Sequence, residues 1–253
     1  IKISYMTNNI YFIANWKMHG IRSSVNSLNK LINLSKTKKY SKAKIIYFPP
    51  FTLIKDFIKK FDKTKISVGG QNCHEVEDYG SFTGSISPKM LKDLGCKYVI
   101  LGHSENRTSG ETDQVINKKI LSALNKNIKV VFCIGETLKQ KRKKLTYSVL
   151  KKQINHGLKG IKNYQNILIA YEPVWSIGTG VIPKDKELEM NVNKICKLIS
   201  KMTKLKIPIL YGGSVNNKNI SSLKYISGIS GFLVGSASQN SKKFIDIIKK
   251  TIN

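Results

Sequence analysis

The chain has 253 residues, of which 41% are hydrophobic, so it can build a sizeable core and wholesale disorder is excluded. It carries 44 Lys and Arg against 15 Asp and Glu, a formal net charge of +29 that ordinarily suggests a nucleic-acid partner. Only three of these residues are arginine, the side chain that base and phosphate recognition favours. Because the abundant Lys, Ile and Asn have A/T-rich codons, we attribute the charge to genome composition and expect no nucleic-acid partner.

The sequence also contains indications of where in the cell the protein resides. No run of 18 apolar residues occurs, so we expect no membrane-spanning segment and no membrane partner. We see no secretory leader, and the four cysteines lack CxxC spacing and are too sparse for a disulfide scaffold or a zinc site. We therefore expect no metal and a reducing, cytoplasmic location.

Short apolar runs that are typical of buried parallel strands recur along the whole chain. In chain order they predict strands at 10–14, 43–48, 66–69, 98–101, 130–134, 167–171, 207–211 and 232–234. Helical patterns, with apolar residues three and four positions apart, lie between them at 25–34, 115–124, 188–199 and 242–252. Eight strands with intervening helices in about 250 residues predict a single (β/α)8 barrel. A doubly wound open sheet is the alternative, because periodicity alone does not show closure.

Chemically capable residues follow the ends of several predicted strands. Lys17, His103 and Glu172 follow the first, fourth and sixth, and glycine-rich turns at 212–214 and 235–237 follow the last two. In a barrel these strand ends meet at one rim. A carboxylate, an imidazole and a lysine beside backbone N–H groups suited to phosphate indicate proton transfer on a small phosphorylated substrate.

Each of these groups also has an ordinary structural explanation when taken alone. A lysine is usually a solvated surface residue, and a histidine or glutamate is often a helix cap or a buried ion-pair partner. Glycines commonly do no more than shape tight turns. The functional interpretation therefore depends on their joint placement at the strand ends.

Several motifs at these strand ends, in the right order, resemble those of the triosephosphate isomerase family along essentially the full length. They are Ala14-Asn15-Trp16-Lys17-Met18, Gly102-His103-Ser104-Glu105, Cys133-Ile134-Gly135-Glu136-Thr137, Glu172-Pro173-Val174-Trp175, Ile177-Gly178-Thr179-Gly180, Tyr211-Gly212-Gly213-Ser214 and Leu233-Val234-Gly235. The resemblance implies a single-domain TIM barrel over residues 6–253. Residues 1–5 precede Met6 and do not match the family, so we expect them to be a non-native or upstream extension.

The resemblance implies interconversion of dihydroxyacetone phosphate and glyceraldehyde 3-phosphate, in glycolysis and gluconeogenesis, through an enediolate and without a cofactor. It makes Glu172 the catalytic base and His103 the neutral electrophile, and it gives Lys17 the role of the cation at the substrate. The further substrate-binding residues that it implies are Asn15, through its side chain, and Gly178, Ser214, Gly235 and Ser236, through backbone N–H groups.

The resemblance also implies a lid and a homodimer. Residues 173–183 correspond to the lid, but its end, Val181-Ile182-Pro183, departs from the family pattern. Since proline restricts one backbone angle, we expect closure with altered kinetics. The loop around Thr83 is expected to reach a partner subunit near Asn15 and His103.

Two other functions remain open at this point. A different phosphate-binding barrel would share the glycine turns after the last two strands, although it would not need the lysine, histidine and glutamate motifs together. A catalytically inactive barrel that binds partners through its lysines is the second alternative, and the presence of every acid–base residue argues against it.

Overall fold

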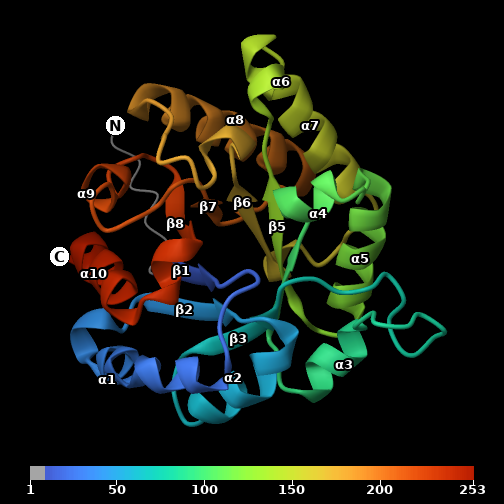
Figure 1. Ribbon diagram of the computed structural model, residues 1–253. Helices are drawn as coiled ribbons and strands as arrows, with labels where there is room; N and C mark the ends of the chain where they lie inside the picture. The colour runs from blue at the N-terminus through green and yellow to red at the C-terminus, as the bar shows by residue number, and fades with distance from the viewer. Residues whose placement is uncertain (1–8) are drawn as a thin grey trace.

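The computed structural model describes residues 9–253, and the predicted extension at residues 1–5 lies outside them. Eight parallel strands form one sheet in sequence order, and β1 also pairs with β8, so the sheet is a closed barrel (Figure 1). The strands are β1 (Ile10–Asn15), β2 (Ala43–Phe48), β3 (Ser67–Gly70), β4 (Tyr98–Leu101), β5 (Lys129–Ile134), β6 (Ile167–Tyr171), β7 (Ile209–Tyr211) and β8 (Ile229–Val234). The predicted barrel is confirmed, and the open-sheet alternative is wrong.

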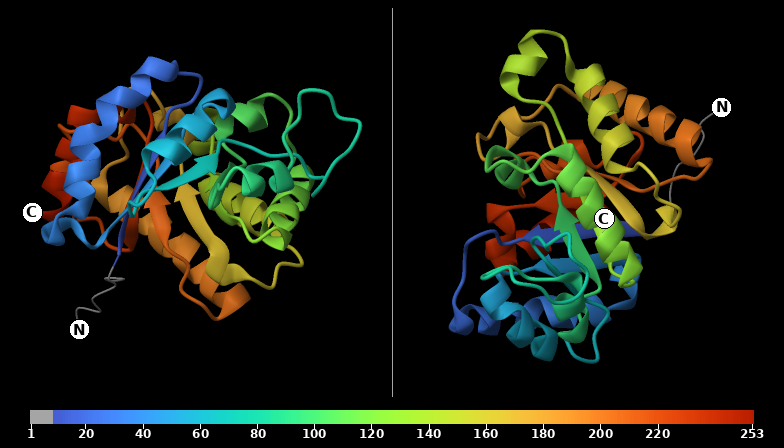
Figure 2. Two further views of the ribbon diagram at one scale, coloured as in Figure 1. Left: turned by 90° about the horizontal axis from the view of Figure 1, so that it is seen from below. Right: turned by 90° about the vertical axis from the view of Figure 1, so that its right-hand side faces the viewer.

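Helices surround the barrel on all sides, as the three views of Figures 1 and 2 show. The α-helices are α1 (Asn29–Lys36), α2 (Ile54–Lys60), α3 (Pro88–Asp93), α4 (Ser104–Thr108), α5 (Asp113–Asn125), α6 (Leu138–Arg142), α7 (Thr146–Gly157), α8 (Asp185–Thr203), α9 (Ile220–Leu223) and α10 (Ser241–Ile252). The 3-10 helices are η1 (Arg22–Leu28), η2 (Lys38–Tyr40), η3 (Phe51–Leu53), η4 (Tyr164–Asn166), η5 (Val174–Ser176) and η6 (Ser236–Gln239). Of the helices in residues 9–253, none is both long and apolar enough to cross a membrane.

The first predicted helix, at 25–34, differs in the structure because its first half is the 3-10 helix η1. The sequence of η1, Arg-Ser-Ser-Val-Asn-Ser-Leu, is rich in residues with low α-helix propensity. The other three predicted helices are confirmed as parts of α5, α8 and α10, although their ends differ by up to four residues.

Side-chain caps define where several helices begin. The hydroxyls of Ser87 and Thr112 accept backbone N–H groups at the starts of α3 and α5, and the Asn240 side chain does the same for α10. These bonds satisfy donors that have no partner inside the helix. Each cap therefore fixes the residue at which its helix begins.

The alternation of side chains along each strand divides the core in two. One cluster contains only strand residues, among them Ile13, Ile100 and Leu210, and it fills the barrel interior. The second cluster combines the opposite strand faces with apolar residues of the helices, such as Phe57 and Phe244. Both faces of every strand are thus covered, as continuous apolar runs predict.

Tyr47 carries a buried polar atom within this second cluster. Its ring packs among Trp16, Phe57, Phe61 and Phe244 at centroid distances of 5.3–6.1 Å. Among the described residues, none forms a hydrogen bond with its hydroxyl. Burial raises the pKa of this phenol, so the hydroxyl stays protonated and unpaired.

We predict that Tyr47→Phe raises the free energy of unfolding by about 1 kcal/mol, because the ring contacts stay and an unsatisfied hydroxyl is removed. Denaturant unfolding at matched protein concentration measures the change. Tyr47→Leu is the control, and it should destabilise the protein because the ring contacts are lost. A lower stability for Tyr47→Phe than for the wild type would contradict the prediction.

Candidate active site

A cavity of about 330 Å³ opens at the carboxyl ends of the strands. Its lining includes Lys17, His103 and Glu172, which follow β1, β4 and β6. The predicted phosphate-binding positions line it too: Gly178, Ser214, Gly235 and Ser236. The structure therefore brings together the residues that the sequence predicts for the site, except that Asn15 lies buried beneath the cavity rather than in its lining.

His103 is buried and caps the short helix α4 through its side chain. Its Nδ1 accepts the backbone N–H of Glu105 at 3.3 Å. A ring nitrogen that accepts a hydrogen bond carries no proton, so this contact favours the tautomer whose proton lies on Nε2. Within the described residues Nε2 has no hydrogen-bond partner, which leaves one buried donor available in the cavity.

Glu172 is buried opposite this donor. Its Oε1 lies 3.7 Å from His103 Nε2, and its Oε2 accepts no hydrogen bond from any described residue. The backbone of Gly212 approaches so closely that a Cβ there would lie 2.7 Å from Glu172 Cγ. The adjoining thiol of Cys133 has a pKa well above its usual range, because it is buried and because Glu172 is next to it. The carboxyl group of Glu172, the imidazole of His103 and a thiol that stays protonated therefore lie together in one buried region.

Lys17 follows β1 in an uncommon left-handed conformation with φ of 54°. The Asn15 side-chain oxygen accepts the N–H of Lys17 at 3.0 Å, and Gln71 donates to the Lys17 carbonyl at 2.9 Å. The Lys17 ammonium pairs with Glu105 Oε1 at 2.5 Å at the mouth of the cavity. Glu105 thus contacts Lys17 through its carboxylate and His103 through its backbone N–H, a role that its place in the Gly-His-Ser-Glu motif did not reveal.

The glycine-rich loops form the opposite wall. Gly178 has a φ of 71°, a conformation that glycine adopts without strain. Ser236 begins η6 with a backbone outside the left-handed region, so its N–H can face an anion without strain. The N–H of Ser214 differs from the expectation, because it donates to the Ser176 carbonyl at 3.1 Å. Binding of an anion by this N–H requires that bond to open or to be shared.

Trp175, at the centre of η5, is anchored by groups outside the lid. Its indole N–H donates to Glu136 Oε1 at 2.9 Å, and the Lys141 ammonium lies 3.5 Å from the centre of its ring. Glu136 is fully buried, and this burial raises the pKa of its carboxyl. The hydroxyl of Tyr171 is a second donor to Glu136, at 3.2 Å. Glu136 and Lys141 are functional candidates that the sequence did not indicate, because they are recognised only by their contacts with Trp175.

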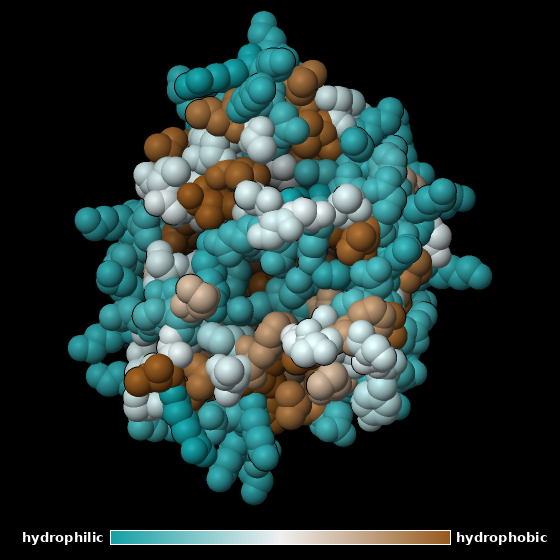
Figure 3. Space-filling view, turned by 45° about the vertical axis from the view of Figure 1, so that its right-hand side comes forward, coloured by the Kyte–Doolittle hydropathy of each residue, from teal (hydrophilic) through white to brown (hydrophobic). Residues whose placement is uncertain are grey.

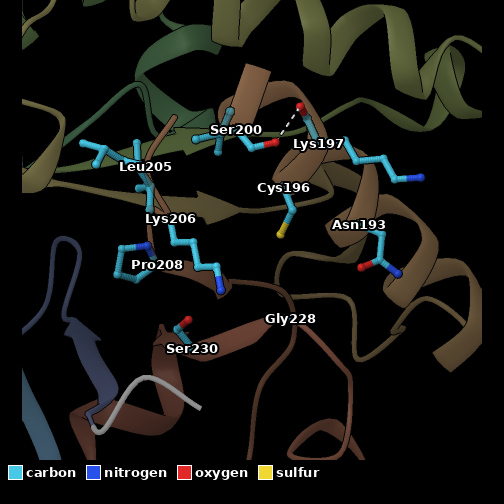
Figure 4. A pocket seen from close by; sticks show the side chains of 11 residues that line it. Asn193, Cys196, Lys197, Ser200, Leu205, Lys206, Pro208, Gly228 and Ser230 are labelled. Carbon is cyan, nitrogen blue, oxygen red and sulfur yellow. Dashed lines mark hydrogen bonds between the residues drawn. The ribbon is translucent and has the colours of Figure 1, made fainter. Parts of the chain in front are cut away.

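A second cavity, of about 260 Å³, lies at the other end of the barrel. It lies between α8, the approach to β7 and the start of β8, and Cys196, Ser200 and Leu205 are among its walls (Figure 4). No carboxylate or imidazole of the described residues lines it. Of these two cavities, only the one at the carboxyl ends is therefore lined by a carboxylate and an imidazole.

These features define a class of protein, a (β/α)8-barrel enzyme whose reactive side chains surround one pocket at the carboxyl ends of the strands. The family model described as "Triosephosphate isomerase" matches residues 10–251. The chain belongs to the triosephosphate isomerase family and is an isomerase.

Individual relatives agree with this assignment. The triosephosphate isomerase of Dictyoglomus thermophilum is 43% identical over 244 residues, which cover 93% of this chain and 97% of the relative. That of Thermodesulfovibrio yellowstonii is 40% identical over 244 residues, covering 94% and 98%. The crystal structure of triosephosphate isomerase from Bartonella henselae superposes with a TM-score of 0.88 at 30% identity, covering 97% of this chain and 100% of that one.

We predict that Gly212→Ala lowers kcat by about a hundredfold, because the new methyl group displaces the Glu172 side chain. Steady-state kinetics measure this loss, and the stability should change little because Gly212 is outside the left-handed region. Gly160→Ala is the matched control. Its φ of 74° makes a side chain costly, and no atom lies within 4 Å of its would-be Cβ, so stability should fall while kcat stays constant. Normal kcat in Gly212→Ala would contradict the prediction.

Proposed function

We propose that this enzyme interconverts dihydroxyacetone phosphate and glyceraldehyde 3-phosphate through an enediolate. The observation that carries the proposal is the pairing of Glu172 with His103. A carboxylate oxygen and a protonated imidazole nitrogen face each other at 3.7 Å, both buried, and each side chain has a polar atom without a partner in the described residues. Polar atoms that are buried without partners are costly, and both of these side chains line a cavity in which a ligand can satisfy them.

Glu172 acts as the base in the proposed reaction. Its carboxylate removes a proton from one substrate carbon, and the electron pair of that C–H bond moves towards the neighbouring carbonyl to form the enediolate. The same carboxyl then returns a proton to the adjacent carbon, while the hydroxyl proton passes from the oxygen of the first carbon to that of the second, so that a carbonyl forms on one carbon and a hydroxyl on the other.

His103 and Lys17 stabilise the negative charge that develops on oxygen. The Nε2–H of the neutral His103 donates to the substrate oxygen, and the hydrogen bond from Glu105 to Nδ1 maintains this tautomer. Lys17 supplies positive charge once the substrate competes for its contact with Glu105. Gly178, Gly235 and Ser236 supply backbone N–H groups to the phosphate, with Ser214 joining them when its bond to Ser176 opens, and Asn15 stabilises the turn that presents Lys17.

We predict that the intact protein converts glyceraldehyde 3-phosphate in a coupled assay. Glu172→Asp should lower kcat by about a hundredfold, because it withdraws the carboxylate from the carbon by the length of one methylene group. His103→Gln should lower it by about a hundredfold or more, because a preorganised donor is lost. Absence of turnover in the wild type would exclude this function and favour a barrel that only binds partners.

We further propose that the active form is a homodimer. The loop between β3 and α3 projects from the body of the molecule, as the teal segment at the right of Figure 1 shows, and Tyr79 on it is 74% exposed. Phe82 and Thr83 are exposed on the same loop, and Met18, beside Lys17, is completely exposed. Apolar side chains presented in this way are typical of an interface. The loop around Thr83 of one subunit would cover the region of Met18, near Asn15 and His103, in its partner.

We predict that Tyr79→Asp shifts the protein from dimer to monomer and reduces activity, because a charge would be buried in the interface. Sedimentation velocity and kcat measure the two effects. Tyr225→Asp is the matched control, since Tyr225 is 79% exposed after α9 and should leave the dimer unchanged. A wild-type protein that is monomeric and fully active would exclude the proposed dimer.

The positive surface provides a separate contribution to the rate. Lysine is spread over the whole sequence, and Figure 3 shows hydrophilic side chains around the outline of one face, with apolar side chains grouped closer to its centre. A net charge of +29 attracts an anionic substrate and raises its encounter rate.

We predict that kcat/KM for glyceraldehyde 3-phosphate falls as salt increases, because the screening length shortens to about 8 Å near physiological ionic strength. The kcat should remain constant. Uncharged glyceraldehyde is the control substrate, and its turnover should not respond to salt. If both substrates respond equally, the charge does not assist catalysis.

A further inference from the structure

Gln153 is a buried polar side chain on α7 to which the proposed reaction gives no role. Its Oε1 accepts the backbone N–H of Gly135 at 2.9 Å, and its Nε2 donates to the carbonyl of the same glycine at 3.1 Å. Both bonds are buried, and both go to the residue that directly follows β5. The side-chain amide therefore pairs with the backbone of Gly135 in place of a neighbouring strand.

A side chain is used here because Gly135 lies beyond the strand ladders on both sides. β4 pairs with β5 as far as Leu101 opposite Phe132, and β6 pairs with β5 as far as Tyr171 opposite Ile134. A buried backbone N–H and carbonyl without partners would be costly. Gln153 supplies one acceptor and one donor for them.

The packing of α7 on β5 explains why a glutamine reaches this position. Gly157 lies one helical turn beyond Gln153 on the same face of α7. It approaches β5 so closely that a Cβ there would lie 2.3 Å from Phe132 Cζ. The helix therefore lies against the strand, and the length of a glutamine side chain spans the remaining distance to the strand end.

Gly135 lies at the centre of the segment that holds the proposed base. The carbonyl of Ile134 accepts the N–H of Glu172 at 2.8 Å, and the carbonyl of Glu136 accepts the N–H of Val174 at 3.0 Å. Between these two bonds, a Cβ on Gly135 would lie 1.8 Å from the Glu172 carbonyl oxygen, so the two backbones are in direct contact. A shift of Gly135 therefore displaces both carbonyls and the residue that they hold.

From these contacts we infer that Gln153 is a positioning residue that fixes the backbone of Glu172 through Gly135. The inference rests on the proposed function, because it requires Glu172 to be the base. Gln153 is not among the residues that line the cavity, so it acts on the reaction only through this contact. A displaced base lowers the rate of proton transfer but leaves the affinity for the substrate nearly unchanged, because other groups hold the phosphate.

The test compares Gln153→Met with the wild type in the full chain, at a temperature at which circular dichroism shows both to be folded. Methionine has nearly the length and volume of glutamine but makes neither bond. The kcat should therefore fall about tenfold, while KM stays within about twofold of the wild type. Gln153→Glu has the same length and keeps an acceptor for the N–H of Gly135, so its kcat should lie between the two.

Asn117→Leu is the matched control. The Asn117 amide, on α5, also makes two hydrogen bonds to the backbone, with the carbonyls of Gly157 and Lys159 at 2.9 Å each, at the end of α7. Its loss should lower the stability about as much as Gln153→Met does and leave kcat unchanged. If Gln153→Met folds and keeps the wild-type kcat, or if both variants lose kcat equally, the inference is overturned.

Amide hydrogen exchange separates this inference from the proposed function. In Gln153→Met the amides of Gly135 and Glu172 should exchange about tenfold faster than in the wild type, whereas that of Phe12 in β1 should not change. Faster exchange together with an inactive wild type would retain the role of Gln153 in holding Glu172 but exclude the proposed reaction. Unchanged exchange at Glu172 would overturn the role of Gln153 whether or not the wild type is active.

Discussion

The pairing of β8 with β1 is the constraint on which the other features depend. It runs from Tyr11 opposite Gly231 to Ala14 opposite Val234. The strands approach so closely that a Cβ at Gly231 would lie 2.1 Å from the Tyr11 carbonyl oxygen, so glycine is required at this position of the seam. Because every strand is parallel, closure brings all eight carboxyl ends to one rim. Groups from the first and the last strand therefore border the same pocket.

Buried polar atoms at the rim of the barrel lower the stability of the fold, and the apolar core offsets this loss. His103 and Glu172 are buried with polar atoms that no described residue satisfies. Such atoms destabilise a folded chain by about 1–3 kcal/mol each. Two apolar clusters, one inside the barrel and one beneath the helices, supply the stability that tolerates them. The unsatisfied atoms at the strand ends leave the pocket ready for a polar ligand.

The large positive charge and the local electrostatics of the site are separate matters. Lys17 of the pocket is paired with Glu105, whose backbone N–H also donates to His103 Nδ1. The proposed chemistry therefore depends on a few directed contacts, whereas the charge of +29 would act on the approach of an anionic substrate.

The amino-acid sequence by itself determined the eight strands and the positions of His103 and Glu172 at strand ends, because hydrophobic period and strand ends are local properties. Only the tertiary structure decided that the sheet closes, that Gly212 lies against Glu172, and that Glu105 pairs with Lys17 across 88 positions of the chain. Contacts between residues so distant in sequence arise from packing and closure, and no local pattern encodes them.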